Sequence, residues 1–454
     1  MSTAPSAELA IVTNLWAALR VPDRARYLER AAQAVIDEFD ELCVAIAAES
    51  RRPPAEIAPL ELLAAVDALR WLAEHSRRLT GAHRFGLPRA LHPLTRASAG
   101  FAPVGVVGIR GARGAPFAQP LATVGAALLA GNGVVLAPGA DAAGAGARLA
   151  AVLARAGLPE GLVHVGNVSL ARCARVLEEG AGPAGADAMI VLADASVRHA
   201  ADGALWGACA GAGQLAGSVK RVYVVRERFE ELLEALCRGV GELALGDPLL
   251  AGTQLGPLAE PSVARALEDA VAQALAGGAT LHCGGPRTVE GVAGCFYAPA
   301  VLSGVPAGAR LLERRVAGPV LALTPVADSA EAVALANGGE RSLGASVWGS
   351  DRRAGVRIAR ELRARVVWGN DHPPVPPPRM VAARALRQCT REQLIAWDPP
   401  ARRPPWRYPY DGATATAART LATLRSAREG DRERALRDGG SATAMWFAGR
   451  ALRR

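Results

Sequence analysis

Short apolar strands alternate with helical segments after residue 100, and this alternation limits the fold more than any other feature of the sequence. The runs GVVGI (105–109), GVVLAP (133–138) and GLVHVG (161–166) have the length and composition of buried strands. Residues 120–131 and 145–157, which lie between them, have the length and composition of helices. Because parallel strands need long and usually helical connections, the pattern predicts an α/β fold with a parallel sheet and right-handed crossovers.

The pattern continues on both sides of this region. Apolar residues recur every three or four positions in 23–49 and in 57–77, which predicts two amphipathic helices. Residues 81–100 are punctuated by Pro and Gly, where we expect an extended hairpin, and 391–400 suggests an edge strand. A second alternating region is expected to hold strands near 189–194, 221–225, 319–326, 344–348 and 365–369, and helices near 196–212, 227–242, 260–277 and 351–364.

Charge and cysteine usage exclude several classes of protein. The net charge is +9, but residues 401–454 contain 12 arginines against five acidic residues, so the first 400 residues carry a net charge of only +2. A nearly neutral body does not support a nucleic-acid partner. The seven cysteines form no C-x-x-C pair and the seven histidines lack metal-ligand spacing. We therefore expect no disulfide framework, no metal site and a cytoplasmic location.

A set of collinear motifs resembles the NAD(P)-dependent aldehyde dehydrogenase superfamily, over roughly residues 15 to 400. The motifs are PVGVVG (103–108), ALLAGNGVVLAP (127–138), AGLPEGLVHV (156–165), MIVLADA (189–195), GAGQ and RVYV within 211–224, GDPLLAGTQLGPL (246–258), FYAPAVL (296–302) and SLGASVW (342–348). The resemblance implies an aldehyde-dehydrogenase-like α/β fold with four parts. These are a degenerate Rossmann-type cofactor domain (1–80 and 101–184), oligomerisation strands (81–100 and 388–400), a second, catalytic-type α/β domain (185–372) and an Arg-rich C-terminal extension (401–454).

The family reaction oxidises an aldehyde to a carboxylic acid, and the resemblance implies where its residues should lie. A cysteine thiolate attacks the carbonyl, hydride passes to the nicotinamide, and a glutamate activates the water that releases the thioester. Alignment without gaps places Ala216 at the cysteine, Gly182 at the glutamate and Gly114 at the asparagine that stabilises the oxyanion. A methyl group cannot act as a nucleophile, and glycine has no side chain to accept or donate a proton. We therefore expect no catalytic residue of the family to be retained.

The positions that hold the cofactor in this family are also changed. Ala137 takes the place of a lysine, Arg315 that of the glutamate beside the nicotinamide ribose, and Ala317 that of a neighbouring aromatic residue. The link from Pro159 to Gly182 is short by about thirty residues, which should include the helix N-terminus that receives the pyrophosphate. We expect no cofactor, although NAD or NADP would bind if the family function survives.

Three features offer alternatives to a lost site. Cys209, on the helix before Ala216, could act as a displaced nucleophile, although a buried inert thiol is the commoner role of such a residue. Ser218 lacks both a G-x-S-x-G turn and an evident histidine partner. The run GAGPAG (180–185) matches a dinucleotide fingerprint, but a helix is expected before it and a strand after it, the reverse of what the fingerprint needs.

These observations lead to three hypotheses for function. The first is a catalytically inactive pseudoenzyme with a structural or regulatory role, which pairs with itself or with an active aldehyde dehydrogenase paralogue. The second is an active NAD(P)-dependent enzyme with a displaced nucleophile. The third is a ligand- or membrane-surface-binding module, because the extension 401–454 mixes aromatic residues with arginine and could contact anionic lipid weakly. Packing of this extension on the body or on a neighbouring subunit is the simpler interpretation.

Overall fold

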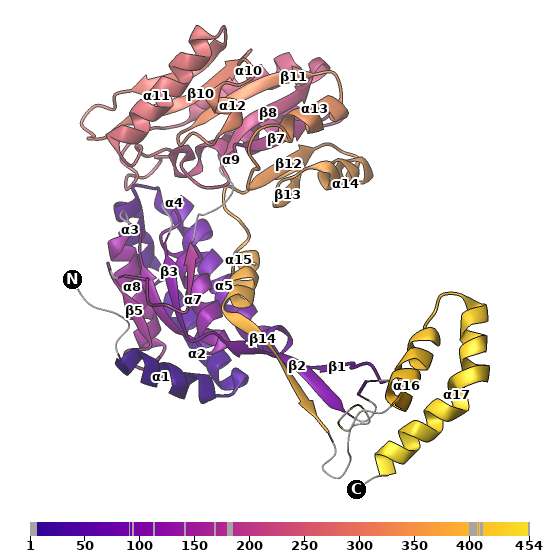
Figure 1. Ribbon diagram of the computed structural model, residues 1–454. Coiled ribbons are helices and arrows are strands. Elements are labelled where there is room, and N and C mark those ends of the chain that lie inside the picture. Colours follow the sequence, from indigo (N-terminus) through magenta and orange to yellow (C-terminus); the bar gives the residue numbers. More distant parts are fainter. Residues whose placement is uncertain are drawn as a thin grey trace. The chain divides into compact units, whose positions relative to one another are not determined.

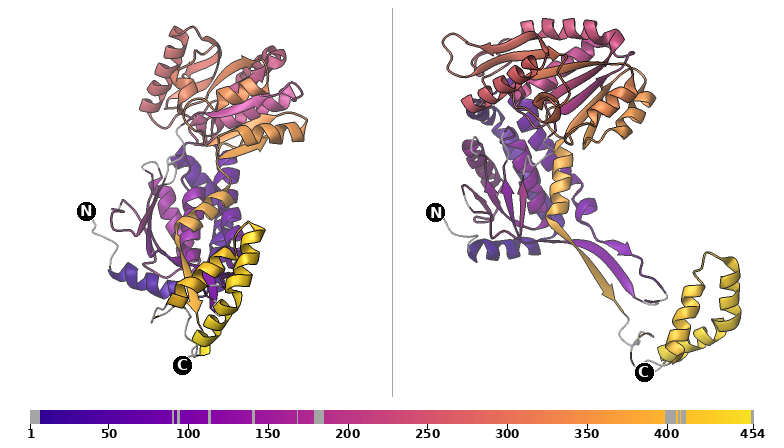
Figure 2. Two further views of the ribbon diagram at one scale, coloured as in Figure 1. Left: turned by 45° about the vertical axis from the view of Figure 1, so that its right-hand side comes forward. Right: turned by 45° about the horizontal axis from the view of Figure 1, so that its top comes forward.

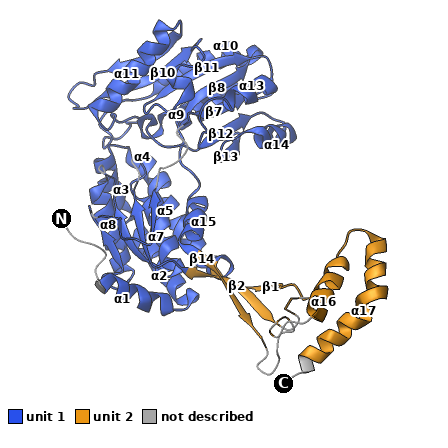
Figure 3. Cartoon of the chain, in the orientation of Figure 1, with its two compact units in different colours: residues 1–79, 103–390 blue, residues 80–102, 391–454 orange. Residues whose placement is uncertain are grey.

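The computed structural model describes residues 7–89, 91–92, 95–111, 114–139, 142–167, 169–178, 185–398, 406, 408 and 412–452. The chain divides into two compact units, shown in Figure 3: residues 1–79 with 103–390, and residues 80–102 with 391–454. The first unit contains two separate sheets with their helices, and the second contains a small sheet and two helices (Figure 1). The α/β fold class predicted from the alternating pattern is confirmed.

A four-stranded parallel sheet forms the centre of the Rossmann-like part. It consists of β3 (Val106–Arg110), β4 (Gly133–Ala137), β5 (Val163–Val165) and β6 (Arg175–Glu178), in the order β5-β4-β3-β6. The crossover helices α7 (Ala118–Ala130) and α8 (Ala143–Arg155) take the chain outward from β3 to β5, and the chain then returns to place β6 on the other side of β3. This reversal is a topological switch point, where open α/β sheets bind their ligands beyond the carboxyl ends of the strands.

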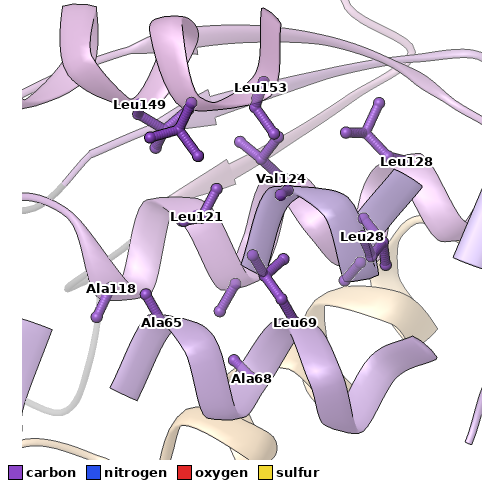
Figure 4. Close-up of a cluster of buried hydrophobic side chains, with 14 of the residues drawn as sticks. Leu28, Ala65, Ala68, Leu69, Ala118, Leu121, Val124, Leu128, Leu149 and Leu153 are labelled. Carbon is purple, nitrogen blue, oxygen red and sulfur yellow. The ribbon is translucent and has the colours of Figure 1, made fainter. Parts of the chain in front are cut away.

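Helices from both ends of the first unit share one apolar core with α7 and α8. Leu28, Leu69, Leu121 and Leu149 are fully buried in it, and Figure 4 shows them on the facing sides of neighbouring helices. Each such leucine contributes about 1.5–3 kcal/mol by burial. The helices are α1 (Ala7–Ala18), α2 (Val21–Asp37), α3 (Phe39–Ser50), α4 (Pro54–Ile57), a π-helix η1 (Ala58–Leu63), α5 (Ala64–Glu74), α6 (Ser76–Thr80) and α15 (Pro378–Gln388).

The two long N-terminal helices predicted from periodicity are both broken in the structure. The first ends at Asp37, because the backbone of Glu38 leaves the helical region, and a separate helix then packs against α8. The second contains the π-helical turn at 58–63, where Pro59 has no N–H to donate and the usual bonding pattern is replaced. The first break leaves the predicted apolar face toward the core, but the π-helical turn shifts the second: Leu62 is buried there, whereas Leu63, expected on the apolar face, is 59% exposed.

The second sheet has seven strands in the order β13-β12-β7-β8-β11-β10-β9, and only the β9–β10 pair is antiparallel. Separate apolar cores cover its two faces, which explains why the central strands are buried along their whole length. The strands are β7 (Asp187–Val191), β8 (Val219–Val225), β9 (Thr280–Arg287), β10 (Phe296–Ser303), β11 (Val320–Val326), β12 (Gly344–Trp348) and β13 (Val366–Gly369). The helices are α9 (Val197–Cys209), η2 (Ala210–Gly213), η3 (Arg226–Arg228), α10 (Phe229–Glu242), α11 (Pro261–Ala276), α12 (Arg310–Glu313), α13 (Ser329–Ala336) and α14 (Arg352–Glu361).

After β13 a proline-rich segment returns the chain to the Rossmann-like part. Consecutive prolines exclude helix up to Pro377, and Pro378 is then the first residue of α15. The helix that follows these prolines was not predicted from the sequence. Helix α15 packs against α5 and α7, as Figures 1 and 2 show. It therefore brings residues near the C-terminal end of the first unit alongside the Rossmann-like sheet.

The second unit contains β1 (His83–Phe85), β2 (Arg96–Pro103) and β14 (Thr390–Trp397) in the order β1-β2-β14. The strands include the predicted hairpin, in which β1 and β2 pair antiparallel, and the predicted edge strand. Helices α16 (Gly412–Thr423) and α17 (Glu429–Leu452) pack on each other, and Trp406 contacts the rings of Trp446 and Phe447. Within the described part of the chain, no helix combines the length and apolar character needed to span a membrane.

Candidate functional site

A small cavity lies at the switch point of the Rossmann-like sheet. Its volume is about 90 Å³, which is room for several non-hydrogen atoms. Glu178, at the carboxyl end of β6, lines this cavity, and its carboxylate lies 3.7 Å from the guanidinium of Arg110 at the end of β3. The other lining residues are Gln119, Thr123, Leu177, Ala216, Leu343, Arg365, Pro376, Met380, Val381, Arg384, Ala385 and Gln388.

Ala216 lies on the loop that joins η2 to β8, and its half-buried methyl group lines the cavity. Three consecutive left-handed residues lead into this loop: Gly211 (φ 61°), Ala212 (φ 51°) and Gly213 (φ 68°). A Cβ on Gly213 would lie 2.3 Å from the carbonyl carbon of Gly318, so only glycine permits this close approach. The three left-handed residues and this close approach fix the conformation of the loop that carries Ala216.

The side chain of Gln214 explains why the Gly-Gln pair persists beside Ala216. Its amide nitrogen donates to the carbonyl of Gly211 at 3.0 Å, and its amide oxygen accepts from the N–H of Ala259 at 3.0 Å. On the other side of the loop, the N–H of Gly217 donates to the carbonyl of Pro374 at 2.9 Å. These bonds hold the shape of the loop and require no reaction at residue 216.

Gly114 is placed directly against the Ala216 loop, as the resemblance implies. A Cβ at Gly114 would lie 3.4 Å from the side chain of Leu215 and 3.6 Å from the carbonyl oxygen of Gln214. The carbonyl of Gly114 accepts a hydrogen bond of 3.1 Å from the guanidinium of Arg52. The structure thus brings close together the two positions that the resemblance assigns to the nucleophile and to the oxyanion donor.

A buried ionic network connects the segment of Gly114, the start of α7 and the segment of Gly211. Arg52 pairs with Glu56 at 2.5 Å and with Glu61 at 2.9 Å. Glu56 accepts from the N–H of Gly211, and Glu61 accepts from the first N–H groups of α7. Sequence analysis did not single out these three residues, because their spacing resembles that of ordinary charged residues on a helix surface.

Glu178 is the second feature that sequence analysis missed. Alignment without gaps put Gly182 at the position of the family's general base, and Gly182 lies outside the described residues. The carboxylate that the structure brings into the cavity with Ala216 belongs instead to Glu178. The signal was present in RVLE (175–178), whose four residues were too few to be recognised as the last strand of the sheet.

Lys220, the only lysine of the chain, joins two loops behind the cavity. Its ammonium group donates to the carbonyl oxygens of Gly213 at 2.9 Å and Gly318 at 2.5 Å. Burial, together with the nearby positive charge of Arg315, lowers the pKa of Lys220 to about 7, and the side chain is only 1% exposed. Lys220 therefore fixes the loop of Ala216 against the turn that contains Ala317 and Gly318.

The family's cofactor positions are separated in this structure. Arg315 is exposed and Ala317 half-buried on the turn beside the Ala216 loop. Ala137, at the end of β4, is instead buried in an apolar cluster with Leu9 and Leu170. The environment of Ala137 is therefore the wrong kind for a group that binds a charged phosphate or a ribose hydroxyl.

The residues between β5 and β6 do not fit a dinucleotide. A pyrophosphate site of this fold needs a helix N-terminus that supplies free N–H groups. Only nine residues join β5 to β6, and those that the structure describes, 166–167 and 169–174, form no helix. Leu170 and Cys173 instead pack onto the sheet, within 3.2 Å of where a Cβ of Gly108 would lie.

The proposed replacement nucleophiles are both away from the cavity. Cys209, at the end of α9, lines a different pocket, and burial raises the pKa of its thiol to about 12. Ser218 is fully buried, and its hydroxyl has no hydrogen-bond partner among the described residues. Neither side chain is in a state suited to nucleophilic attack near Ala216.

No group of three or more His, Cys, Asp or Glu residues suited to a metal ion occurs in the described ranges.

The fold and the site define a two-domain protein with a Rossmann-like sheet, a second α/β sheet and a cavity at the switch point. A protein-family sequence model described as "Aldehyde dehydrogenase family" matches residues 3–179 and 169–382 of the chain. The chain belongs to the aldehyde dehydrogenase family. The residues in both matches, 169–179, include Glu178 and the end of the shortened segment.

Curated relatives and solved structures agree with this assignment. The chain is 30% identical over 383 residues to 4,4'-diapolycopene aldehyde oxidase of Methylomonas sp, covering 77% of this chain and 70% of the relative. It is 29% identical over 404 residues to phenylacetaldehyde dehydrogenase of Pseudomonas fluorescens, covering 82% and 80%. An NAD-dependent benzaldehyde dehydrogenase from Corynebacterium glutamicum shares the fold with a TM-score of 0.75 and 24% identity, over 86% of this chain and 88% of that chain. An E. coli NADP-dependent enzyme does so with a TM-score of 0.77 and 23% identity, over 86% and 89%. Of these proteins, the benzaldehyde dehydrogenase uses NAD and the E. coli enzyme uses NADP.

Proposed function

We propose that this chain is a catalytically inactive member of the aldehyde dehydrogenase family, kept for a structural or regulatory role in an oligomer. The observation that carries the proposal is the methyl group of Ala216 on an intact nucleophile loop. Gly114 beside it provides no oxyanion donor, which in other enzymes costs about 2.7–4 kcal/mol of transition-state stabilisation. Glu178 alone cannot replace either group, because a general base needs a nucleophile or a water placed against a reacting carbon.

The alternative of an active enzyme with a displaced nucleophile has weaker support. It would need Cys209 to ionise, yet at neutral pH a thiol with a pKa of about 12 is almost entirely protonated. It would also need Cys209 and Glu178 to reach one substrate carbon, although the two residues line different pockets.

Cofactor binding tests the proposal directly. We expect calorimetric titration with NAD and with NADP to show no saturable binding up to millimolar concentration, because residues 166–167 and 169–174 form no helix whose N-terminus could receive a pyrophosphate. Turnover of small aldehydes should likewise stay at the rate of a buffer blank. A dissociation constant in the micromolar range, or cofactor-dependent oxidation of an aldehyde, would overturn the proposal.

The exposed edge strand β14 supports an oligomer. Seven of its eight residues are exposed, and Leu394, Ile395 and Trp397 give this edge strand an apolar surface, with Trp397 73% exposed. Exposed apolar edge strands are usually covered by another chain. The covering chain is a second copy or an active paralogue.

Light scattering on the purified protein tests this part of the proposal. We expect a dimer or larger assembly, and substitution Trp397→Asp should shift it to monomer while the melting temperature of the first unit stays unchanged. Substitution Arg391→Asp, at the start of the same exposed strand, is the matched control and should leave the assembly intact. A native protein that is monomeric alone and in the presence of an active paralogue would contradict the oligomeric role.

A further inference from the structure

Two arginines from separate parts of the first unit line the cavity of Ala216. Arg365 immediately precedes β13 of the seven-stranded sheet, and Arg384 lies on α15, which packs on the helices of the Rossmann-like part. Neither side chain forms an ion pair with any residue that the structure describes. Burial lowers the pKa of Arg384, and so does the nearby positive charge of Arg365, which places the two guanidinium groups within each other's field.

Arg365 and Arg384 line the cavity as exposed side chains, and Glu178 is the one acidic residue in its lining, so the charged residues of the lining sum to a net charge of +1. A guanidinium group binds a carboxylate through two parallel N–H bonds, which is the strongest form of this contact. In the described part of the chain, Glu178 pairs with Arg110 at 3.7 Å and not with Arg365 or Arg384. The net positive charge of the lining therefore favours a negatively charged ligand.

The remaining lining limits what kind of anion fits. Leu177, Ala216, Leu343, Met380 and Val381 give the cavity an apolar wall, and its volume of about 90 Å³ excludes large ligands. An apolar wall favours an anion with a short hydrocarbon tail over an inorganic ion, because burial of the tail is favourable and a fully hydrated ion would lose its water. A cysteine at position 216 would add a reactive atom to this wall, whereas alanine adds only a methyl group.

We propose that the cavity beside Ala216 binds a short-chain carboxylic acid, with its carboxylate held between Arg365 and Arg384. This inference rests on the proposed function, since an inactive protein would use the vacated site to bind an acid and not to form one. A bound acid would connect α15 to the seven-stranded sheet, and so provide the regulatory input of the proposed role.

Calorimetric titration with butyrate tests the inference, and butyramide and inorganic phosphate serve as comparison ligands. We expect saturable binding of butyrate, and binding at least about tenfold weaker for butyramide, which cannot form the charged bonds. Phosphate should also bind at least about tenfold more weakly, because it has no apolar part. No binding of butyrate at 50 mM, or equal binding of butyramide or phosphate, would overturn the inference.

Variants locate the ligand. Arg384→Gln and Arg365→Gln should each weaken butyrate binding by about tenfold or more, while Arg387→Gln should not. Arg387 is exposed on the same helix but does not line the cavity, so it is the matched control. Unchanged melting temperatures will show that the variants are folded, and unchanged affinity in both cavity variants would refute the site. Failure here leaves the pseudoenzyme proposal standing, whereas cofactor-dependent turnover would refute that proposal whatever butyrate does.

Discussion

We expect the native protein to gain about 2 kcal/mol of stability between pH 7 and pH 8.5, and substitution Lys220→Met to abolish this gain. Burial lowers the pKa of Lys220 to about 7, while a lysine in the unfolded chain keeps a pKa near 10.4. Between these values the unfolded state binds more protons than the folded state, so raising the pH favours folding. Below about pH 7 both states carry the proton, and this source of pH dependence disappears.

Urea unfolding curves at several pH values provide the measurement. The measurements should end near pH 8.5, because at higher pH the buried thiols make the stability fall as the pH rises. The pKa of Cys209 is raised to about 12, so ionisation of this thiol in the unfolded chain lowers stability above roughly pH 8.5. Cys209→Ala is therefore the control and should keep the slope below pH 8.5. A Lys220→Met curve that runs parallel to that of the native protein would show that the ammonium group is not desolvated.

The same variant connects stability to the candidate site. Methionine cannot donate to the carbonyl of Gly318, and an unsatisfied buried carbonyl costs about 1–3 kcal/mol. The carbonyl of Gly213 keeps a partner, because it also accepts from the N–H of Gly318. The loops of Ala216 and Ala317 would therefore be held less firmly, and the loss should be largest above pH 7, where native Lys220 is neutral.

The fold could be predicted from sequence wherever the apolar pattern is strong. The strands at 133–137, 187–191 and 219–225 are buried over their whole length and mostly apolar in sequence, and this is why a parallel sheet was recognised. Helix α15 could not be predicted in the same way. A run of prolines precedes it, and the arginines in 379–387 hide the apolar face formed by Ala382, Ala385 and Leu386.

Site residues that lie within a recognisable motif could be predicted from the sequence. Residues whose position had to be counted across a connection between strands could not. Ala216 and Gly114 were found because the chain around them keeps the spacing of the family, and the structure places them together. Glu178 was missed because the position of the general base was counted back from β7, and this count leads to Gly182 and not to the end of β6. Arg384 could not be found from the sequence, because it lies more than 160 residues after Ala216. Only the packing of α15 brings it to the cavity that Ala216 lines.

Substitution Ala216→Cys is expected to create hydrolytic activity toward p-nitrophenyl acetate in a protein that otherwise has none above its background. The loop keeps the backbone that presents residue 216 to the cavity, and Glu178 lines the same cavity. The new thiolate would attack the ester carbonyl, p-nitrophenolate would leave, and water deprotonated by Glu178 would release acetate from the thioester. No cofactor is needed, so the shortened segment between β5 and β6 does not matter.

Two further variants separate the contributions at this site. Glu178→Gln in the Ala216→Cys background should lower turnover by about 100-fold or more, because it removes the general base, while labelling of residue 216 by iodoacetamide continues. Gly114→Asn in the same background should raise turnover by about 100-fold, because it restores an oxyanion donor at a left-handed position that asparagine tolerates. Ala216→Ser controls for the seven native cysteines. If Ala216→Cys reacts with iodoacetamide but hydrolyses no faster than Ala216→Ser, Glu178 does not serve residue 216, and the scaffold has lost its catalytic geometry together with its nucleophile.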